Sequence, residues 1–190
     1  MKKKNEEKYR QIITITSHLI ATEGAAMVST TKVANLVGIS QSNIYIYFKN
    51  KDDLLYQVYL SKLATMQASF AQMQKEDLSV SAQLRAYIMK LYQFATAHPE
   101  DMRVIAQLKI MPNSPLFSGN FPFKDDTKVV RKLIQAGIQA GVLRPVDPEL
   151  HLTIIFNVIR RYTSNPANAD YDPDQFAPVF EMIWAALKRE

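Results

Sequence analysis

Residues 30–51, TTKVANLVGISQSNIYIYFKNK, predict two short helices joined by a tight turn. Val33 and Val37 lie one turn apart and would share the buried face of the first helix. Ala34 is small enough to let a second helix cross closely after the turn. Gly38 stands where a helix can end in the left-handed conformation, which glycine adopts without steric cost. The stretch therefore predicts a helix-turn-helix.

The second helix of the motif is expected to begin after Ser40 and to pack through Ile39 and Ile44. Thr30 and Ser40 have hydroxyl groups that could cap the backbone N–H groups where the two helices start. Helix-turn-helix proteins direct the first residues of the second helix at base edges in the major groove of DNA. The polar side chains left facing outward are those of Gln41, Ser42, Asn43 and Tyr45. A helical hairpin within an ordinary bundle is the alternative interpretation.

Aromatic and basic residues are interleaved after the second helix, where the chain would meet the sugar-phosphate backbone. Asn50 and Asp53 have the spacing of a helix N-cap and its acidic third position, so a new helix should begin at Lys51 with its positive end open to a phosphate. Phe48 is expected in the core instead. The predicted DNA contacts are Thr30, Thr31, Ser40, Gln41, Ser42, Asn43, Tyr45, Tyr47, Lys49 and Lys51.

The segment from Ile12 to Leu55 resembles the N-terminal domain of the tetracycline-repressor (TetR) family of bacterial transcriptional regulators. The matching positions are an amphipathic first helix that ends at Glu23 and Gly24, then Thr30-Thr31, Val33-Ala34, Val37-Gly38-Ile39-Ser40, Ile44-Tyr45, Tyr47-Phe48, Lys51 and Leu54-Leu55. Ser42 departs from the glycine of many members, so the DNA sequence is harder to predict. The resemblance implies a homodimeric, ligand-responsive repressor that binds a near-palindromic operator and is released by a small-molecule effector.

The positive charge of the chain is concentrated near its N-terminus. Residues 1–51 hold 8 Lys or Arg and 3 Asp or Glu, whereas residues 52–190 hold 15 of each. A basic module joined to a neutral remainder supplies the sequence-independent attraction to phosphates that DNA binding needs. Lys2–Lys4 form either a solvated tail or an arm that touches DNA. We expect a DNA-binding domain over residues 1–50 and a ligand-binding and dimerisation domain over residues 51–190.

Several classes of function find no support in the sequence. The chain has no cysteine, which excludes disulfides and thiolate metal sites. His18, His98 and His151 lack the spacing of metal ligands, and no catalytic motif occurs, so we expect no enzyme activity, metal or cofactor. No apolar stretch has the length of a signal peptide near the N-terminus or of a membrane span anywhere, which predicts a cytoplasmic protein without a membrane partner. A helical protein-interaction scaffold without DNA binding is the competing interpretation.

Helical periodicity continues from Lys51 to the C-terminus. The fold is therefore expected to be all-α, with an N-terminal three-helix helix-turn-helix domain and a C-terminal helical bundle for regulation and dimerisation. The expected helices cover residues 51–74, 81–97, 100–111, 124–140, 148–164 and 174–188, with Gly141 as a C-cap. Residues 112–123 (PNSPLFSGNFPF) are expected to form a loop because three prolines and a glycine interrupt any regular helix.

The last two predicted helices are apolar over more than one face. One apolar stripe is enough for the core of a monomer, so a second stripe indicates contact with another copy of the chain. The family resemblance implies that these two helices pair with their copies in a four-helix bundle. The predicted dimer residues are Phe156, Ile159, Phe176, Phe180, Ile183, Trp184 and Leu187.

Aromatic and flexible side chains between residues 62 and 160 suit an adaptable pocket for an apolar or amphipathic effector. The resemblance implies that this effector binds inside the helical bundle. The candidates are Met66, Phe70, Tyr92, Met102, Leu108, Met111, Phe117, Phe121 and Phe156. Most of them are expected to be plain core residues, with Tyr92, Phe117 and Phe156 favoured because they lie on different segments that could converge.

Overall fold

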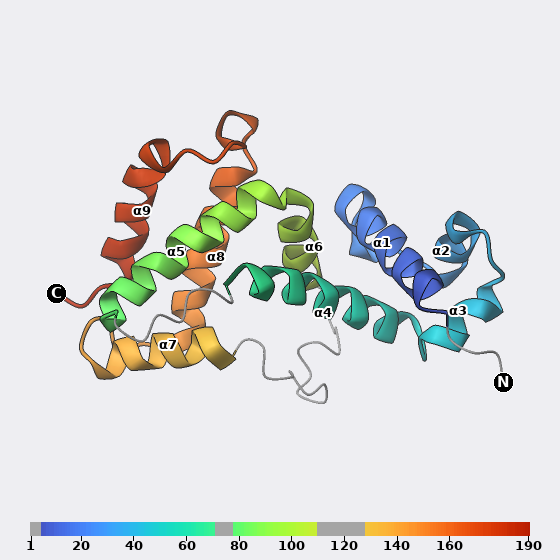
Figure 1. Cartoon of the computed structure of the whole chain (residues 1–190), viewed down its shortest axis with the longest axis horizontal. Helices are drawn as coiled ribbons and strands as arrows, with labels where there is room; N and C mark the ends of the chain where they lie inside the picture. Colours follow the sequence, from blue (N-terminus) through green and yellow to red (C-terminus); the bar gives the residue numbers. More distant parts are fainter. Residues whose placement is uncertain (1–4, 71–77, 110–127) are drawn as a thin grey trace. The chain divides into compact units, whose positions relative to one another are not determined.

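A computed structural model describes residues 5–70, 78–109 and 128–190 of the chain. The regular secondary structure in these residues consists of helices, which confirms the all-α fold (Figure 1). The chain divides into two compact units, one of residues 1–65 and 100–122 and the other of residues 66–99 and 123–190. The predicted loop over residues 112–123 and the Lys2–Lys4 tail lie outside the described residues.

The first unit contains α1 (Glu6–Glu23), α2 (Thr30–Val37), α3 (Gln41–Tyr47), most of α4 (Lys51–Phe70) and most of α6 (Pro99–Lys109). Its apolar side chains meet between the helices, and Ile12, Ile20, Val33 and Ile44 are fully buried. Phe48 is buried as predicted, and its ring stacks on that of Tyr9 with the centroids 5.3 Å apart.

The turn between α2 and α3 has the predicted geometry. Gly38 adopts the left-handed conformation with φ of 72°, which an L side chain would strain. Its N–H donates to the Asn35 carbonyl oxygen, and the N–H of Ile39 donates to that of Ala34, so the last carbonyl groups of α2 are satisfied. These bonds hold α3 at a fixed angle to α2.

Of the two caps predicted within the helix-turn-helix, one is misplaced by one residue and the other is in position but makes no capping bond. Ser29, rather than Thr30, caps α2, because its side chain accepts the Lys32 N–H and Thr30 is already the first helical residue. Ser40 occupies the N-cap position of α3, but its Oγ lies 2.9 Å from that of Ser42 and makes no capping bond.

The start of α4 confirms the predicted cap. The Asn50 side chain accepts the Asp53 N–H at 2.8 Å, and the Asp53 carboxylate accepts the Lys49 N–H at 2.8 Å. This reciprocal pair satisfies backbone donors that would otherwise lack partners at the helix start. It also fixes the path of the chain between α3 and α4.

A side chain of α6 holds the end of α1 within the first unit. The short 3-10 helix Ala25–Met27 follows α1, and the Ala25 N–H donates to Oε1 of Gln107 at 2.9 Å. Nearby, the His18 ring lies 3.8 Å from the Glu100 carboxylate. The end of α1 therefore has α6 as a direct neighbour, although 82 residues separate Ala25 from Gln107.

The second unit is a bundle of α5 (Val80–Ala97), α7 (Lys128–Gln139), α8 (Pro148–Thr163) and α9 (Pro173–Leu187), together with the end of α4. In this unit α5 packs against α7, α8 and α9, and α8 packs against α7 and α9 (Figure 1). Between α8 and α9 the chain forms the 3-10 helix Pro166–Asn168. Gly141 follows α7 and has a φ of 71°, which confirms the predicted left-handed glycine at the end of this helix.

The seven residues predicted at a dimer contact are all buried within one chain, with at most 9% of any of them exposed. The ring of Phe176, for example, stacks on that of Tyr92 at 3.9 Å, and the Arg85 guanidinium lies 4.3 Å from the ring centre of Trp184. These residues belong to the core of their own unit. The outward face of α9 instead consists of Ala177, Pro178, Glu181, Met182, Ala185 and Ala186.

Candidate nucleic-acid interface

The polar side chains predicted to meet DNA lie on or beside α3, in the first unit. Gln41, Ser42 and Tyr45 are exposed, with half of the Tyr45 surface open to solvent, and Asn43 is half-buried. Only Ile44 of this helix is buried, so it anchors α3 while its neighbours stay outside. Among the other predicted contacts, Thr31, Ser40 and Lys49 are exposed, whereas Tyr47 and Lys51 are half-buried.

Thr30 differs from the rest of the predicted set because it is 7% exposed. Its Oγ1 accepts a hydrogen bond from Nε2 of Gln41 at 3.0 Å and lies 3.3 Å from the hydroxyl oxygen of Tyr45. Gln41 and Tyr45 are four residues apart and so share one face of α3. Thr30 therefore joins two exposed side chains of α3 to α2.

The flanks of α3 hold further groups suited to a phosphate backbone. The Tyr47 hydroxyl oxygen accepts the backbone N–H of Asn5 at 3.4 Å, which ties the start of α1 to the end of α3. Lys49 and Lys51 follow, and Lys51 is the first residue of α4. Lys32 forms an ion pair with Glu23, so part of its charge is neutralised inside the unit.

The residues considered for an effector pocket include several that are buried in the core, as was expected of most of them. Tyr92, Met102 and Phe156 are buried, and Met66 is half-buried. The Tyr92 hydroxyl accepts the Asp172 N–H at 3.0 Å, so this side chain connects α5 to the start of α9. Met111, Phe117 and Phe121 lie outside the described residues.

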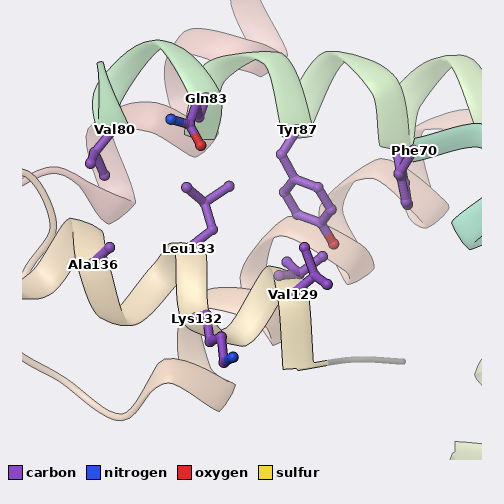
Figure 2. A pocket seen from close by; sticks show the side chains of 9 residues that line it. Phe70, Val80, Gln83, Tyr87, Val129, Lys132, Leu133 and Ala136 are labelled. Atoms are coloured by element: carbon purple, nitrogen blue, oxygen red, sulfur yellow. The ribbon is translucent and has the colours of Figure 1, made fainter. Parts of the chain in front are cut away.

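A cavity of about 430 Å³ lies between α5, α7 and the end of α4, all within the second unit (Figure 2). Its walls are mostly apolar, and Phe70 is the one predicted candidate among them. Helical periodicity alone did not identify the rest, because it separates buried from exposed positions but does not show where facing helices leave a gap. The lining residues are Phe70, Val80, Gln83, Tyr87, Val129, Val130, Lys132, Leu133 and Ala136.

Tyr87 gives this cavity a polar group. Its side chain extends from α5 toward Val129 on α7, with the hydroxyl at the far end (Figure 2). Burial raises the pKa of the Tyr87 phenol above its ordinary value, so the group stays protonated near neutral pH and can donate a hydrogen bond. The Phe70 ring packs beside it, with the ring centroids 5.4 Å apart.

Residues 5–70, 78–109 and 128–190 hold neither a cluster of metal ligands nor a membrane-spanning helix. No three His, Asp or Glu side chains in these ranges are grouped as metal ligands. None of the helices there is long and apolar enough to cross a membrane.

The comparisons with known proteins agree with the exposed helix-turn-helix. The family model described as "Bacterial regulatory proteins, tetR family" matches residues 12–58. A crystal structure from Lactobacillus plantarum, assigned as a transcription regulator, is 32% identical and superimposes with a TM-score of 0.76 over 95% of this chain and 99% of that one. The structure of a TetR-family regulator from Haemophilus influenzae shares the fold with a TM-score of 0.72 at 22% identity, over 97% and 98% of the two chains.

A curated relative from Bacillus subtilis, the "Fatty acid metabolism regulator protein", is 26% identical over 160 residues, which cover 83% of this chain and 82% of the relative. The relatives and the family are transcriptional regulators and not enzymes, and the match extends over both units. These comparisons thus favour a DNA-binding protein over the alternative of a helical interaction scaffold. With its helix-turn-helix matched by family, by fold and by full-length relatives, the chain belongs to the TetR family of DNA-binding transcriptional regulators.

Proposed function

We propose that the protein is a homodimeric repressor that binds a near-palindromic operator and is released by a small apolar or amphipathic effector. The observation that carries the proposal is the exposed polar face of α3, where Gln41, Ser42 and Tyr45 surround a helix anchored by one buried isoleucine. Side chains in this position can read base edges, while Tyr47, Lys49 and Lys51 at the end of the helix contact phosphates.

The outward face of α9 supports a homodimer. Met182 is 58% exposed and lies among Pro178, Ala185 and Ala186, which are small or apolar and also exposed. Small side chains let two helices approach closely, and a methionine adapts to the surface of a partner. A second copy of the chain would cover this face through a two-fold axis. Such an axis would present two copies of α3 to one operator.

The cavity of the second unit supports an effector of defined chemistry. Its apolar walls favour a lipophilic body, and the protonated Tyr87 hydroxyl favours a carbonyl or ester oxygen that accepts a hydrogen bond. The volume of about 430 Å³ lies within the range of small-molecule sites. Because a relative regulates fatty acid metabolism, acyl compounds are sensible first probes.

Release of DNA follows from a population shift. In the dimer, the two copies of α3 can be held at a spacing that matches the operator or at one that does not. An effector that binds the non-matching state more tightly lowers the affinity for DNA. The size of the effect is set by the difference in effector affinity between the two states. An effector present at about 100 times its dissociation constant should also stabilise the free protein by roughly 2.7 kcal/mol per site.

A panel of fatty acids, acyl esters and neutral lipophilic compounds tests the effector model. Each compound is scored for the shift in thermal unfolding and for release of the protein from its operator. Ala136→Phe places a ring in the cavity and should remove both responses, whereas Ala140→Phe, one turn along the chain at an exposed position, should retain them. Compounds that stabilise the protein and never release DNA would refute the effector model while leaving DNA binding intact.

A further inference from the structure

The hydroxyl of Thr30 lies behind α3 and meets two of its exposed side chains. Oγ1 of Thr30 is 3.0 Å from Nε2 of Gln41 and 3.3 Å from the hydroxyl oxygen of Tyr45. Thr30 itself is 7% exposed, so little of it is left to touch DNA. The first turn of α2 therefore supplies a fixed hydrogen-bonding group to the helix beside it.

The direction of the Gln41 bond determines what this side chain can offer to a base. A glutamine amide has two N–H donors and one carbonyl oxygen that accepts. Thr30 takes one of the two N–H groups, since the Gln41 amide nitrogen is the donor. The other N–H and the carbonyl oxygen remain available to a base.

A free N–H beside a free carbonyl oxygen is the pair that glutamine presents to adenine, where the nitrogen donates to N7 and the oxygen accepts from N6. An unrestrained glutamine samples several rotamers, and only some of them carry this pair to a base edge. The bond to the Thr30 hydroxyl holds the Gln41 amide in one place before DNA arrives. Specificity then depends on a side chain that is itself buried.

We propose that Thr30 is a positioning residue that sets the preference for adenine through Gln41 without contacting a base. This inference rests on the proposed base-reading role of Gln41. The two side chains are joined from different helices, so the angle between α2 and α3, fixed at Gly38, also becomes part of the reading geometry. The Tyr45 hydroxyl contacts the same Thr30 hydroxyl, so both exposed side chains on this face of α3 are held from α2.

The test compares Thr30→Val with the parent protein on a selected operator and on duplexes in which single base pairs are changed. Valine keeps the branched shape and removes only the hydroxyl. Gln41 and Tyr45 are exposed, so water can replace the lost bonds and the fold should survive, as thermal unfolding will show. Thr22→Val on α1 is the matched control, because its hydroxyl bonds only the His18 carbonyl oxygen of its own helix.

We expect Gln41 to discriminate adenine from other bases roughly 5- to 150-fold, and Thr30→Val to reduce that ratio by roughly 2- to 12-fold. Thr30→Ser keeps the hydroxyl and should restore the ratio, while Thr22→Val should leave it unchanged. In a Gln41→Ala background, Thr30→Val should have no further effect on discrimination.

Three other outcomes would each overturn the inference for a different reason. If Gln41→Ala abolishes base discrimination and Thr30→Val does not alter it, Gln41 reads DNA without help from Thr30. Equal loss of affinity for every duplex in Thr30→Val would make Thr30 a general structural or phosphate-contacting residue. If Gln41→Ala itself leaves discrimination unchanged, the base-reading role of Gln41 is wrong, and the role of Thr30 fails with it.

Discussion

Nζ of Lys62 lies 2.7 Å from Oδ1 of Asp101, with only 18% and 12% of the two side chains exposed. The pair joins α4 to the first turn of α6 within the first unit. The carboxylate also lies in the first turn of α6, where the positive end of the helix dipole attracts its negative charge. An ion pair so well shielded from water is costly to break on one side only, because the remaining charge stays partly buried.

Replacing one partner of this pair should therefore destabilise the protein. We expect Lys62→Met to lower the free energy of unfolding by about 2 to 4 kcal/mol, since it leaves Asp101 without its cation. Urea unfolding followed by circular dichroism measures the effect. Arg10→Met removes the exposed pair between Arg10 and Glu6 on α1 and should make no measurable difference. Equal stabilities for the two variants would mean that the buried pair contributes nothing.

Lys51 should contribute affinity for DNA without specificity. A phosphate contact releases about one counterion, so Lys51→Ala should reduce the slope of log Kd against log salt by about one unit for any duplex. Fluorescence anisotropy at several salt concentrations measures the slope. Lys90→Ala on α5 is the control and should preserve it. A slope that Lys51→Ala leaves unchanged would remove this lysine from the interface.

The outward face of α9 should hold the two copies of the chain together. Met182→Glu places a charge on an exposed side chain, so we expect monomers that remain folded. Light scattering measures the mass. Trp184→Glu, by contrast, would put a charge into the core of one chain and should unfold the second unit. A Met182→Glu protein that remains dimeric would place the dimer contact on another surface.

Tyr87 should make stability depend on pH in the alkaline range. In the unfolded chain its phenol ionises near its ordinary pKa of 10.0, whereas burial raises the pKa in the folded state. The folded state thus keeps a proton that the unfolded state loses, so this contribution to stability is complete below about pH 10 and declines as the pH rises further. In urea titrations, Tyr87→Phe should lose less stability than the parent above about pH 10. Identical pH profiles for the two proteins would contradict the assignment.

The sequence predicted those parts of the fold that depend on local signals. Gly38 and Gly141 ended helices where a left-handed residue was expected, and the pair of Asn50 and Asp53 started α4. The cap at Ser29 was assigned to Thr30, because adjacent hydroxyl residues have almost the same preference for the N-cap position. Ser40 is at the N-cap position as predicted but makes no capping bond. Only the three-dimensional path of the chain decides which hydroxyl reaches a backbone N–H.

Contacts between distant segments were beyond the reach of the sequence. No local pattern pairs Lys62 with Asp101 or Gln107 with Ala25, because several charged and polar residues on α6 have equivalent helical positions. The apolar stripes of the last two helices were recognised, but the pattern did not show which side faced the chain's own core. A buried tryptophan and an exposed methionine on α9 both count as apolar in such a pattern.

Selection of bound duplexes from a random pool shows whether a two-fold pair of α3 helices reads DNA. We expect an enriched near-palindrome whose half-sites are centred about one helical turn apart. We also expect an adenine in each half-site that Gln41→Ala no longer selects. A pool with no enriched sequence, or a single half-site bound by one copy of the chain, would show that the protein does not bind an operator as a two-fold dimer.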